Sequence, residues 1–511
     1  MSISSGREGV LVGQLPTNWA RRTPRKTAIV FGEERISFQD FNDRVNRCAA
    51  FLTQQGLRKG DKVAVLSRNR PELLEILFAA AKSGITYVPV NFRLASVEIN
   101  FVLGDSGAKL FLLSDYFEVA RDPAVPVPRV SLESGYAQAR DRMPAIEPEV
   151  ELSEHDMFAI FYTSGTTANP KGVVLTHANF VSNLMNEIIA YGMKQSDVCV
   201  HTLPLYHTAE ASFALAQFYI GGTCVIVETF EASKFWRLVD SEAITHTSVV
   251  FTMLLPLMDA YESAGRKDTG TLRTLGLGGQ TTPVEVLRRA ISLFGPDRLM
   301  IVYGLTESSP YLTYLSKEEL SRDGGHTPRV ASVGKEMFSC HVRVVDDSGN
   351  DVKPGEFGEI IGKGPNVMVG YYNRPDATEA SLRNGWLHTG DVGTIDEDGF
   401  IYVVDRKKDL IISGGENIAP REVEDVIYRH PAIAECSVIG VPDARWGEQV
   451  LAVVVAKPGM SVSQDELIDF CRRDLAGYKL PRSVVHLQAL PKDPLGKIQK
   501  KVLREQFAKS S

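Results

Sequence analysis

Short apolar runs alternate with longer amphipathic stretches along the first part of the chain. The apolar run KVAVL at 62–66 is followed by a helical pattern that opens at Pro71 and stops at Gly84, and then by a second apolar run, TYVPV. Proline suits the first turn of a helix, and glycine readily takes the left-handed conformation in which many helices end. The segment therefore predicts a strand, a helix and a second strand.

The same alternation recurs further along the chain. Apolar runs that predict strands lie in CVHTLP, TCVIVE, THTSVVF, TLRTLGLGG and RLMIVYG, and helical patterns lie between them. Strands that alternate with helices are typical of layered α/β proteins in which most strands are parallel. We therefore expect the first part of the chain to be a layered α/β body.

The pattern changes after about Ser332. The runs HVRVV, GEIIGKG, WLHTGDVGTI and GFIYVV are short, extended and separated by turns rich in Gly, Asp and Asn, which predicts a compact antiparallel β unit. A further stretch has its own helices and strands. The expected fold class is thus α/β, with a large N-terminal domain at 1–405 that includes a β-rich subdomain at about 332–405, and a small α+β C-terminal domain at 406–511.

Composition narrows the function classes. The chain has 511 residues, 44% of them hydrophobic and 23% charged, which is typical of a globular protein with more than one domain. The net charge is −7 and the basic residues are dispersed, so no nucleic-acid partner is expected. Six cysteines lie far apart without a CxxC pair, which favours reduced, buried thiols over disulfides or a zinc site.

No apolar run approaches the roughly 18 residues of a membrane span, and the N-terminal segment lacks a secretory signal pattern. We therefore expect no transmembrane segment and a cytoplasmic location. A small-molecule substrate is favoured, and formation of a homodimer is left open.

The strongest local signal is the segment YTSGTTANPKGV at 162–173, set between two predicted strands. Gly165 and Gly172 permit tight turns, and Lys171 supplies a positive charge. Hydroxyl groups come from Thr163, Ser164, Thr166 and Thr167. Hydroxyl groups, tight backbone turns and a lysine are the groups that suit the oxygens of a polyphosphate. Because Gly172 follows the lysine where a P-loop carries Ser or Thr, a P-loop ATPase is disfavoured; a hairpin turn is the plain alternative.

Seven further motifs follow this loop. They are PLYH at 204–207, GGQTTP at 278–283, YGLTE at 303–307, GYY at 370–372, WLHTGD at 386–391, DRKKDLIISGGEN at 405–417 and PLGKI at 494–498. In this order the set resembles the adenylate-forming superfamily, which contains acyl-CoA and aryl-CoA synthetases, firefly luciferase and the adenylation domains of nonribosomal peptide synthetases. The resemblance covers residues 162 to 498 and is greatest to bacterial fatty-acyl-CoA or aryl-CoA ligases.

The resemblance implies a nucleotide site at the carboxyl ends of the predicted strands. There Tyr303 would stack on adenine, Asp391 would accept hydrogen bonds from the ribose hydroxyls, and Arg406 would lie beside it. The residues expected to contact ATP or AMP are Thr163, Ser164, Gly165, Thr166, Thr167, Gly278, Gly279, Gln280, Tyr303, Gly304, Asp391 and Arg406. Taken alone, several of them are equally typical of turns.

The resemblance also implies catalytic residues and a metal. Glu307 and Thr167 would hold Mg²⁺, a cation that prefers carboxylate and phosphate oxygens. The expected catalytic residues are Lys497, Glu307, Thr306 and Lys171. Lys497 would bridge the attacking carboxylate and the ATP α-phosphate, lowering the barrier electrostatically. Without the resemblance, Thr306 and Glu307 would be interpreted as a capped helix start, and Lys497 as a solvated side chain.

Two half-reactions are implied, and the small C-terminal domain is expected to be mobile between them. First, a carboxylate and MgATP form acyl-AMP and pyrophosphate; second, coenzyme A attacks acyl-AMP and releases AMP. The pivot between the two orientations would be Lys408, although a charged linker residue has the same appearance. After rotation, a tunnel for coenzyme A would be lined by Ser413, Gly414, Gly415 and Glu416.

The expected acyl pocket is largely small or apolar, which favours an aliphatic or aromatic acid. Its residues would be His207, Ala211, Phe213, Phe251, Met253, Gly276, Leu277 and Ser308. His207 would gate the pocket or pack as a structural histidine. Glu210 would mark a polar or amine-bearing substrate, but a charged residue at a helix start is more often a cap.

The leading hypothesis is an ATP-dependent acyl-CoA ligase that uses ATP, Mg²⁺ and coenzyme A. One alternative passes the acyl group to a carrier protein or an amine. Another is a nucleotide-binding regulator without catalysis, which would have lost at least one of Lys171, Glu307, Asp391, Arg406 and Lys497. The sequence retains all five.

Overall fold

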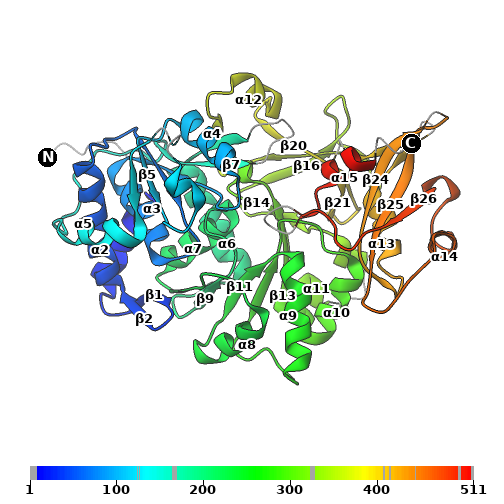
Figure 1. Ribbon diagram of the computed structural model, residues 1–511, viewed down its shortest axis with the longest axis horizontal. Helices are drawn as coiled ribbons and strands as arrows, with labels where there is room; N and C mark the ends of the chain where they lie inside the picture. The colour runs from blue at the N-terminus through cyan, green and yellow to red at the C-terminus, as the bar shows by residue number, and fades with distance from the viewer. Residues whose placement is uncertain are drawn as a thin grey trace.

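The structure is a computed structural model that describes residues 9–122, 125, 127–163, 170–322, 328–406, 409–413, 416–443, 445–492 and 497–507. Figure 1 shows a large body, coloured from blue to yellow, and beside it a smaller unit in orange and red that carries the C-terminus. The fold class is the expected one, an α/β body followed by an α+β unit.

Two sheets with mainly parallel pairing form the centre of the body. Among the described residues the larger sheet has nine strands, in the order β15 (Lys335–Glu336), β14 (Tyr311–Leu315), β13 (Leu299–Gly304), β12 (Thr274–Leu277), β11 (His246–Val249), β9 (Val198–His201), β10 (Thr223–Ile226), β1 (Thr27–Phe31) and β2 (Glu34–Ser37). The second sheet runs β18 (Gly370–Tyr371), β8 (Lys171–Thr176), β7 (Met157–Thr163), β4 (Thr86–Pro89), β3 (Lys62–Leu66), β5 (Leu110–Leu113) and β6 (Arg129–Ser131).

Helices lie on both faces of the larger sheet, and further helices pack on the second sheet and in the smaller unit. The helices are α1 (Gln14–Arg22), α2 (Phe38–Gln54), α3 (Pro71–Ser83), α4 (Ser96–Ser106), α5 (Ala137–Asp141), α6 (His177–Tyr191), α7 (Thr208–Ile220), α8 (Ala232–Ser241), α9 (Phe251–Ser263), α10 (Val284–Phe294), α11 (Lys317–Ser321), α12 (Pro375–Ser381), α13 (Pro420–Ile427), α14 (Gln464–Cys471) and α15 (Lys500–Phe507). One hydrophobic core joins α2, α3, α6 and α7 to both sheets, and a second core joins α8, α9 and α10 to the larger sheet. We call the layer between the two sheets the inner layer and the layer with α8 to α10 the outer layer.

The predicted strand–helix–strand unit is confirmed. Pro71 is the first residue of α3, and Gly84 ends the helix with a φ of +67°. Strands β3 and β4, on either side of it, pair in parallel with Ala64 opposite Val88. All six cysteines are free and buried, as the sequence predicts.

After the body's larger sheet the chain forms an antiparallel sheet and then the smaller unit. The antiparallel sheet contains β16 (His341–Val345), β17 (Gly358–Lys363), β20 (Trp386–Ile395), β19 (Leu382–Arg383) and β21 (Ile401–Arg406). The smaller unit contains β23 (Glu416–Ile418), β22 (Ile411–Ser413), β25 (Gly447–Ala456), β24 (Ile433–Asp443) and β26 (Ser483–His486). The unit has a hydrophobic core of its own, and the boundary between 405 and 406 stays a prediction.

Ionic and polar contacts hold the smaller unit against the end of β21. Lys500 Nζ lies 3.2 Å from Asp405 Oδ2 and 3.0 Å from Glu424 Oε1. Arg421 Nη1 donates a hydrogen bond of 2.8 Å to the Val403 carbonyl. Within the described chain, no helix is both long and apolar enough to cross a membrane.

Candidate active site

Asp391 is the centre of a polar group at the carboxyl end of β13. The Tyr303 hydroxyl donates a 2.7 Å hydrogen bond to Asp391 Oδ2, and Arg406 Nε lies 2.7 Å from Asp391 Oδ1. Asp391 and Arg406 are register partners in the antiparallel pair β20–β21, which is why the two side chains meet. The structure therefore places together the three residues that the sequence assigns to ribose and adenine.

Lys497 acts on the same carboxylate from the far end of the chain. Burial raises the pKa of Asp391, and the charge of Arg406, the Tyr303 hydroxyl and the charge of Lys497 act against that rise. Lys497 is exposed and precedes α15, which Lys500 anchors to Asp405 at the end of β21. The smaller unit thus delivers Lys497 to the neighbourhood of Asp391, although more than 100 residues of sequence separate them.

Tyr371 links two of the expected catalytic residues. Its hydroxyl donates a 2.7 Å hydrogen bond to Glu307 Oε1, and Lys171 Nζ lies 4.9 Å from the centroid of its ring. Strand β18 pairs with β8 so that Tyr371 faces Val173, two residues from Lys171. The GYY motif at 370–372 does not by itself predict a role for Tyr371, because only the β8–β18 pairing shows its position.

Glu307 and Thr306 lie in a short helical turn that follows β13. No group of three or more His, Cys, Asp or Glu side chains that could hold a metal occurs among the residues described. A single carboxylate at this position fits Mg²⁺, which is commonly held by one or two carboxylates together with the phosphates of its substrate.

The predicted phosphate-binding loop joins β7 and β8. Thr163 and Lys171 are opposite each other in that antiparallel pair, so the two ends of the loop are held side by side. The predicted contacts Ser164, Gly165, Thr166 and Thr167 lie outside the described residues.

The glycines after β12 allow the chain to pass close to β13. A Cβ on Gly278 would lie 2.7 Å from Val302 Cγ2, and Gly279 has a φ of +78°. Both positions therefore disfavour any other residue. The neighbouring Gln280 has a buried Nε2 with no hydrogen-bond partner among the described residues.

Part of the predicted acyl pocket faces the inner layer. Ala211 and Phe213 on α7 are fully buried in the inner-layer core, and His207 immediately precedes that helix. Burial lowers the pKa of His207 to about 3, with a smaller effect from the charge of Arg93, so its ring is neutral at pH 7. A Cβ on Gly276 would lie 2.0 Å from the Tyr191 hydroxyl oxygen. Gly276 therefore faces the inner layer, as Ala211 and Phe213 do.

Other predicted pocket residues lie elsewhere. Leu277 and Met253 pack in the outer-layer core, because side chains alternate between the faces of β12 and α9 lies on the outer face. Phe251, at the start of α9, has its ring centroid 6.4 Å from that of Tyr428 in the smaller unit. The Ser308 hydroxyl bonds to the backbone carbonyls of Leu305 and Pro310. The Leu277 and Met253 side chains therefore pack on the opposite side of the sheet from Ala211 and Phe213, and the acyl-pocket assignment stays a prediction.

Glu210 lies in the first turn of α7, as expected for a cap, but it is fully buried. Its Oε1 lies 2.7 Å from Nδ1 of His201, which is also fully buried. The interpretation of Glu210 as a simple surface cap is therefore incomplete, since its carboxylate belongs to a buried pair.

The tunnel and hinge predictions fall partly outside the described residues. Ser413, which is buried, and Glu416, which is exposed, are register partners at the ends of β22 and β23. Gly414, Gly415 and the predicted hinge Lys408 lie outside the described residues.

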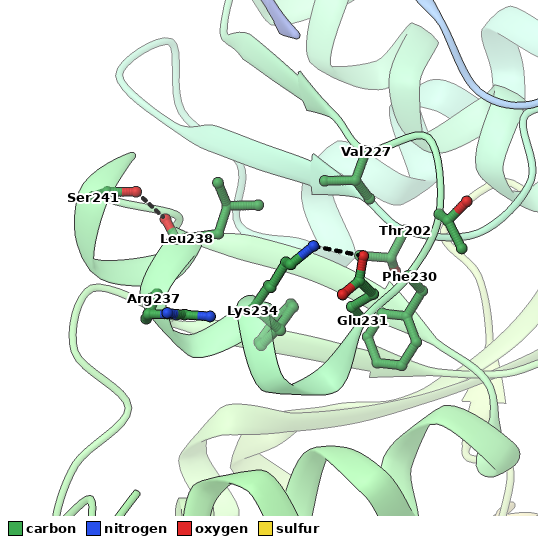
Figure 2. A pocket seen from close by; sticks show the side chains of 10 residues that line it. Thr202, Val227, Phe230, Glu231, Lys234, Arg237, Leu238 and Ser241 are labelled. Atoms are coloured by element: carbon green, nitrogen blue, oxygen red, sulfur yellow. Dashed lines mark hydrogen bonds and ion pairs between the residues drawn. The ribbon is translucent and has the colours of Figure 1, made fainter. Parts of the chain in front are cut away.

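A separate pocket of about 390 Å³ lies in the outer layer (Figure 2). It is bounded by α8 and by the residues that follow β9 and β10, and none of the predicted site residues that the structure describes lines it. The lining residues are Thr202, Val227, Thr229, Phe230, Glu231, Lys234, Phe235, Arg237, Leu238 and Ser241.

Comparison with known proteins covers nearly the whole chain. The profile of AMP-binding enzymes matches residues 17–372, and the profile of the AMP-binding enzyme C-terminal domain matches residues 422–497. A feruloyl-CoA synthase from Amycolatopsis sp is 38% identical over 500 residues, which are 97% of this chain and 99% of that protein.

Solved structures of similar proteins also match nearly the whole chain. The o-succinylbenzoate CoA synthetase (MenE) of Bacillus subtilis in complex with the acyl-adenylate intermediate OSB-AMP has a TM-score of 0.87 and 33% identity, covering 97% of each chain. The same enzyme in complex with ATP and magnesium ion has a TM-score of 0.86 and 34% identity, covering 96% of this chain and 98% of that one. A fatty acyl CoA synthetase of Mycobacterium tuberculosis has a TM-score of 0.78 and 34% identity, covering 98% and 99%.

The substitution Tyr371→Phe tests the link between Glu307 and Lys171. It removes the 2.7 Å hydrogen bond to Glu307 but keeps the ring beside Lys171. Loss of one hydrogen bond to a charged group is worth about 1.5 kcal/mol, so we expect kcat/KM for MgATP to fall roughly tenfold in a pyrophosphate-release assay. The matched control Tyr372→Phe, in the same motif, should leave kcat/KM for MgATP unchanged. Equal values for both variants would show that Tyr371 does not position Glu307.

Proposed function

The chain belongs to the AMP-binding enzymes and is an AMP-forming CoA ligase, and from this premise we propose that it activates a largely apolar carboxylic acid, preferentially an aromatic one. Its substrates are a small-molecule carboxylic acid, ATP with Mg²⁺, and coenzyme A. The observation that carries the proposal is the convergence of Asp391, Arg406 and Lys497, which come from the body, the junction and the smaller unit.

We assign nucleotide binding to the group around Asp391. Each carboxylate oxygen of Asp391 can accept more than one hydrogen bond, so the contacts with Tyr303 and Arg406 leave lone pairs for the ribose hydroxyls. The buried and unpartnered Nε2 of Gln280 suits a nitrogen acceptor on the adenine ring. The phosphates would then extend toward Thr163 and Lys171.

In the first half-reaction, a carboxylate oxygen of the acid attacks the α-phosphorus and the bond to pyrophosphate breaks. The protein has little covalent work in such a transfer, so positioning and charge stabilisation dominate. Lys171 would bind phosphate oxygens and Lys497 would stabilise the charge that builds up at the α-phosphate. Bound Mg²⁺, held by Glu307 and phosphate oxygens, would neutralise part of the triphosphate charge.

In the second half-reaction, the coenzyme A sulfur attacks the carbonyl carbon of acyl-AMP and the bond to the phosphate oxygen breaks, releasing AMP. Lys497 has no role in this step, so the smaller unit can leave its position near Asp391. The Lys500 contact with Asp405 spans the junction and would rearrange as the unit turns about Lys408, whereas the contact of Lys500 with Glu424 lies within the smaller unit. Ser413 and Glu416, with Gly414 and Gly415, would then line the path of coenzyme A.

Two features favour an aromatic acid. Ala211 is a small residue in the inner-layer core, the Tyr191 hydroxyl lies against Gly276, and the ring centroids of Tyr191 and Phe213 lie 5.2 Å apart beside them. Aromatic side chains in such arrangements pack well against another ring. The names of two relatives point to feruloyl and o-succinylbenzoate groups. The name of a third points to fatty acyl groups instead.

The acceptor and the acid are tested together. Pyrophosphate, AMP and thioester are measured across a panel of aromatic and aliphatic acids, with and without coenzyme A. We expect acid-dependent pyrophosphate release, thioester formation only with coenzyme A, and the highest kcat/KM among aromatic acids. Pyrophosphate release without any thioester would identify a different acceptor, and a preference for long-chain acids would overturn the aromatic assignment.

The role of Lys497 is tested with Lys497→Ala. We expect acyl-AMP formation to fall by about 10²- to 10³-fold, as for loss of one group that stabilises transition-state charge. Thioester formation from supplied acyl-AMP should be unchanged, since the lysine acts only in the first step. Lys501→Ala removes a nearby exposed lysine and serves as the control. Equal losses in both half-reactions would contradict the assignment.

A further inference from the structure

Asp105 carries a negative charge at a position where a helix disfavours one. It is the last residue but one of α4, and its side chain is only 9% exposed. The free carbonyl groups at the end of a helix carry partial negative charge, so a carboxylate there is costly unless a cation or hydrogen-bond donors compensate it. The partners of Asp105 therefore indicate what this carboxylate does.

Two partners from distant segments hold the Asp105 carboxylate. The Tyr162 hydroxyl donates a 2.8 Å hydrogen bond to Asp105 Oδ2, and Arg374 Nη2 lies 2.5 Å from Asp105 Oδ1. Tyr162 lies on β7 and Arg374 immediately precedes α12, so three elements meet at one side chain. Figure 1 shows α4, β7 and α12 near one another at the top of the body. We call Asp105, Tyr162 and Arg374 the clamp.

Through Tyr162, the clamp holds the two strands that lead into and out of the predicted phosphate-binding loop. Tyr162 is opposite Gly172 in the β7–β8 pair, and the next pair along is Thr163 with Lys171. A Cβ on Gly172 would lie 3.0 Å from Tyr162 Cζ, so the Tyr162 ring packs directly on the β8 backbone. Fixing this ring therefore fixes the backbone that carries Lys171.

Through Arg374, the clamp holds the turn that carries Tyr371. The Arg374 N–H donates a 3.2 Å hydrogen bond to the Tyr371 carbonyl. The Thr378 hydroxyl on α12 donates to the Arg374 carbonyl and accepts from the Tyr371 N–H, both at 2.9 Å. The Tyr371 side chain contacts Glu307 and Lys171, as described above. A shift of Arg374 would therefore shift the one side chain that touches both.

We propose that Asp105 is a positioning residue for the part of ATP that leaves as pyrophosphate. It holds Lys171 and Glu307 in the places where they meet phosphate oxygens and Mg²⁺, and it acts only through Tyr162 and Arg374. This inference rests on the proposed function, which assigns those two contacts to Lys171 and Glu307.

The residues assigned to adenosine are held by other contacts. Asp391 is held by Tyr303 and Arg406, and no residue of the clamp is among the partners that the described residues give it. The affinity for AMP should therefore be independent of the clamp, whereas the affinity for ATP should depend on it. A general loss of structure would instead lower both affinities together.

The experiment titrates two nucleotides into the full chain by calorimetry in the presence of Mg²⁺. The first is AMP, and the second is α,β-methylene-ATP, from which pyrophosphate cannot be released. Asp105→Asn keeps the shape of the side chain but removes the charge that faces Arg374. Because charge-assisted hydrogen bonds are roughly twice as strong as neutral ones, we expect about tenfold weaker binding of α,β-methylene-ATP and AMP binding within about twofold of wild type.

A double-mutant cycle tests whether Asp105 and Arg374 act as one unit. Arg374→Gln should weaken binding of α,β-methylene-ATP about as much as Asp105→Asn does. The double variant should be no weaker than either single variant, because each substitution already breaks the pair. Losses that multiply in the double variant would show that the two residues act independently, and would overturn the inference.

Tyr162→Phe tests the other side of the clamp with the least disturbance. It removes only the hydroxyl and leaves the ring on Gly172. We expect about threefold weaker binding of α,β-methylene-ATP and unchanged AMP binding, since a single hydrogen bond is lost. This variant also keeps the inference testable if Asp105→Asn does not fold.

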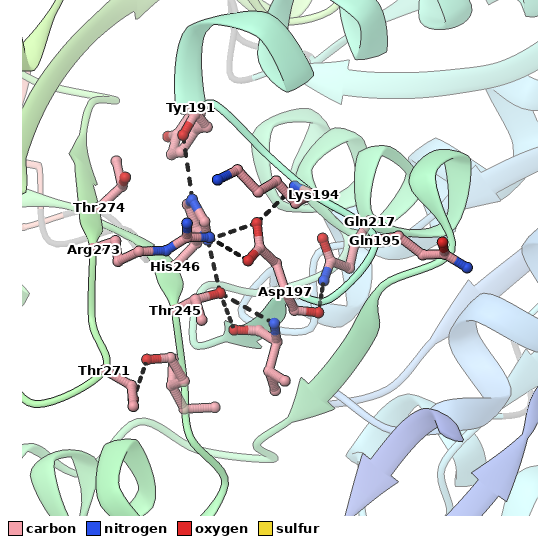
Figure 3. Close-up of polar contacts among 12 residues, drawn as sticks. Tyr191, Lys194, Gln195, Asp197, Gln217, Thr245, His246, Thr271, Arg273 and Thr274 are labelled. Atoms are coloured by element: carbon pink, nitrogen blue, oxygen red, sulfur yellow. Dashed lines mark hydrogen bonds and ion pairs between the residues drawn. The ribbon is translucent and has the colours of Figure 1, made fainter. Parts of the chain in front are cut away.

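A second buried ion pair supplies the matched control (Figure 3). Asp197 is paired with Arg273, and the arginine side chain is 39% exposed in this pair as it is in the clamp. Asp197 precedes β9, so it lies at the opposite edge of the larger sheet from the carboxyl end of β13. Asp197→Asn should therefore leave the ratio of the two affinities at its wild-type value. Thermal melting of each variant measures the loss of stability separately.

The outcomes separate the inference from the proposed function. Unchanged affinity of Asp105→Asn for α,β-methylene-ATP, or an equal loss for both nucleotides, would overturn the inference and leave the ligase assignment intact. The same change of ratio in Asp197→Asn would also overturn it. Absence of acid-dependent pyrophosphate release by the wild-type protein would instead refute the proposed function.

Discussion

The contact between Asp391 and Arg406 is the constraint on which the rest of the site depends. A carboxylate buried to this degree is costly unless a cation and hydrogen-bond donors compensate it. Arg406 supplies the cation from the last residue of β21, where the body ends, and Tyr303 supplies a hydroxyl from β13. The proposed nucleotide site therefore lies at the same point where we expect the chain to leave the body. We propose that the smaller unit turns close to this point.

The two layers of helices contain different features. The inner layer contains α6 and α7, the glycine at position 276 that admits the Tyr191 hydroxyl, and the buried pair of His201 and Glu210. The outer layer contains α8 to α10 and the separate pocket, and the predicted acyl-pocket residues that the structure describes there are Leu277 on β12 and Phe251 and Met253 at the start of α9.

Local sequence patterns predict much of this architecture. The period of the apolar residues, Pro71 at a helix start and Gly84 at its end are local signals, and each strand and helix that they predict occurs. The resemblance that the ordered motifs carry implies that Arg406 lies beside Asp391, and the pairing of β20 with β21 places the two residues opposite each other. The face of β12 on which Leu277 lies was not predicted, since alternation along a strand gives two faces without saying which one is inner.

The contacts that the sequence could not predict join segments that are distant in the chain. Tyr371 reaches Glu307 only because β18 pairs with β8, and Lys500 reaches Asp405 only because the smaller unit folds back onto β21. Asp105 reaches Tyr162 and Arg374 only because α4, β7 and the start of α12 come together in the fold. These two partners are 57 and 269 residues away from it in the sequence. The central claim is that Asp391 holds the nucleotide, and calorimetric titration of AMP into wild-type and Asp391→Asn protein tests it most directly. The account predicts at least about tenfold weaker AMP binding by the variant, since hydrogen bonds to a carboxylate are stronger than those to an amide, whereas equal affinities in two equally stable proteins would contradict it.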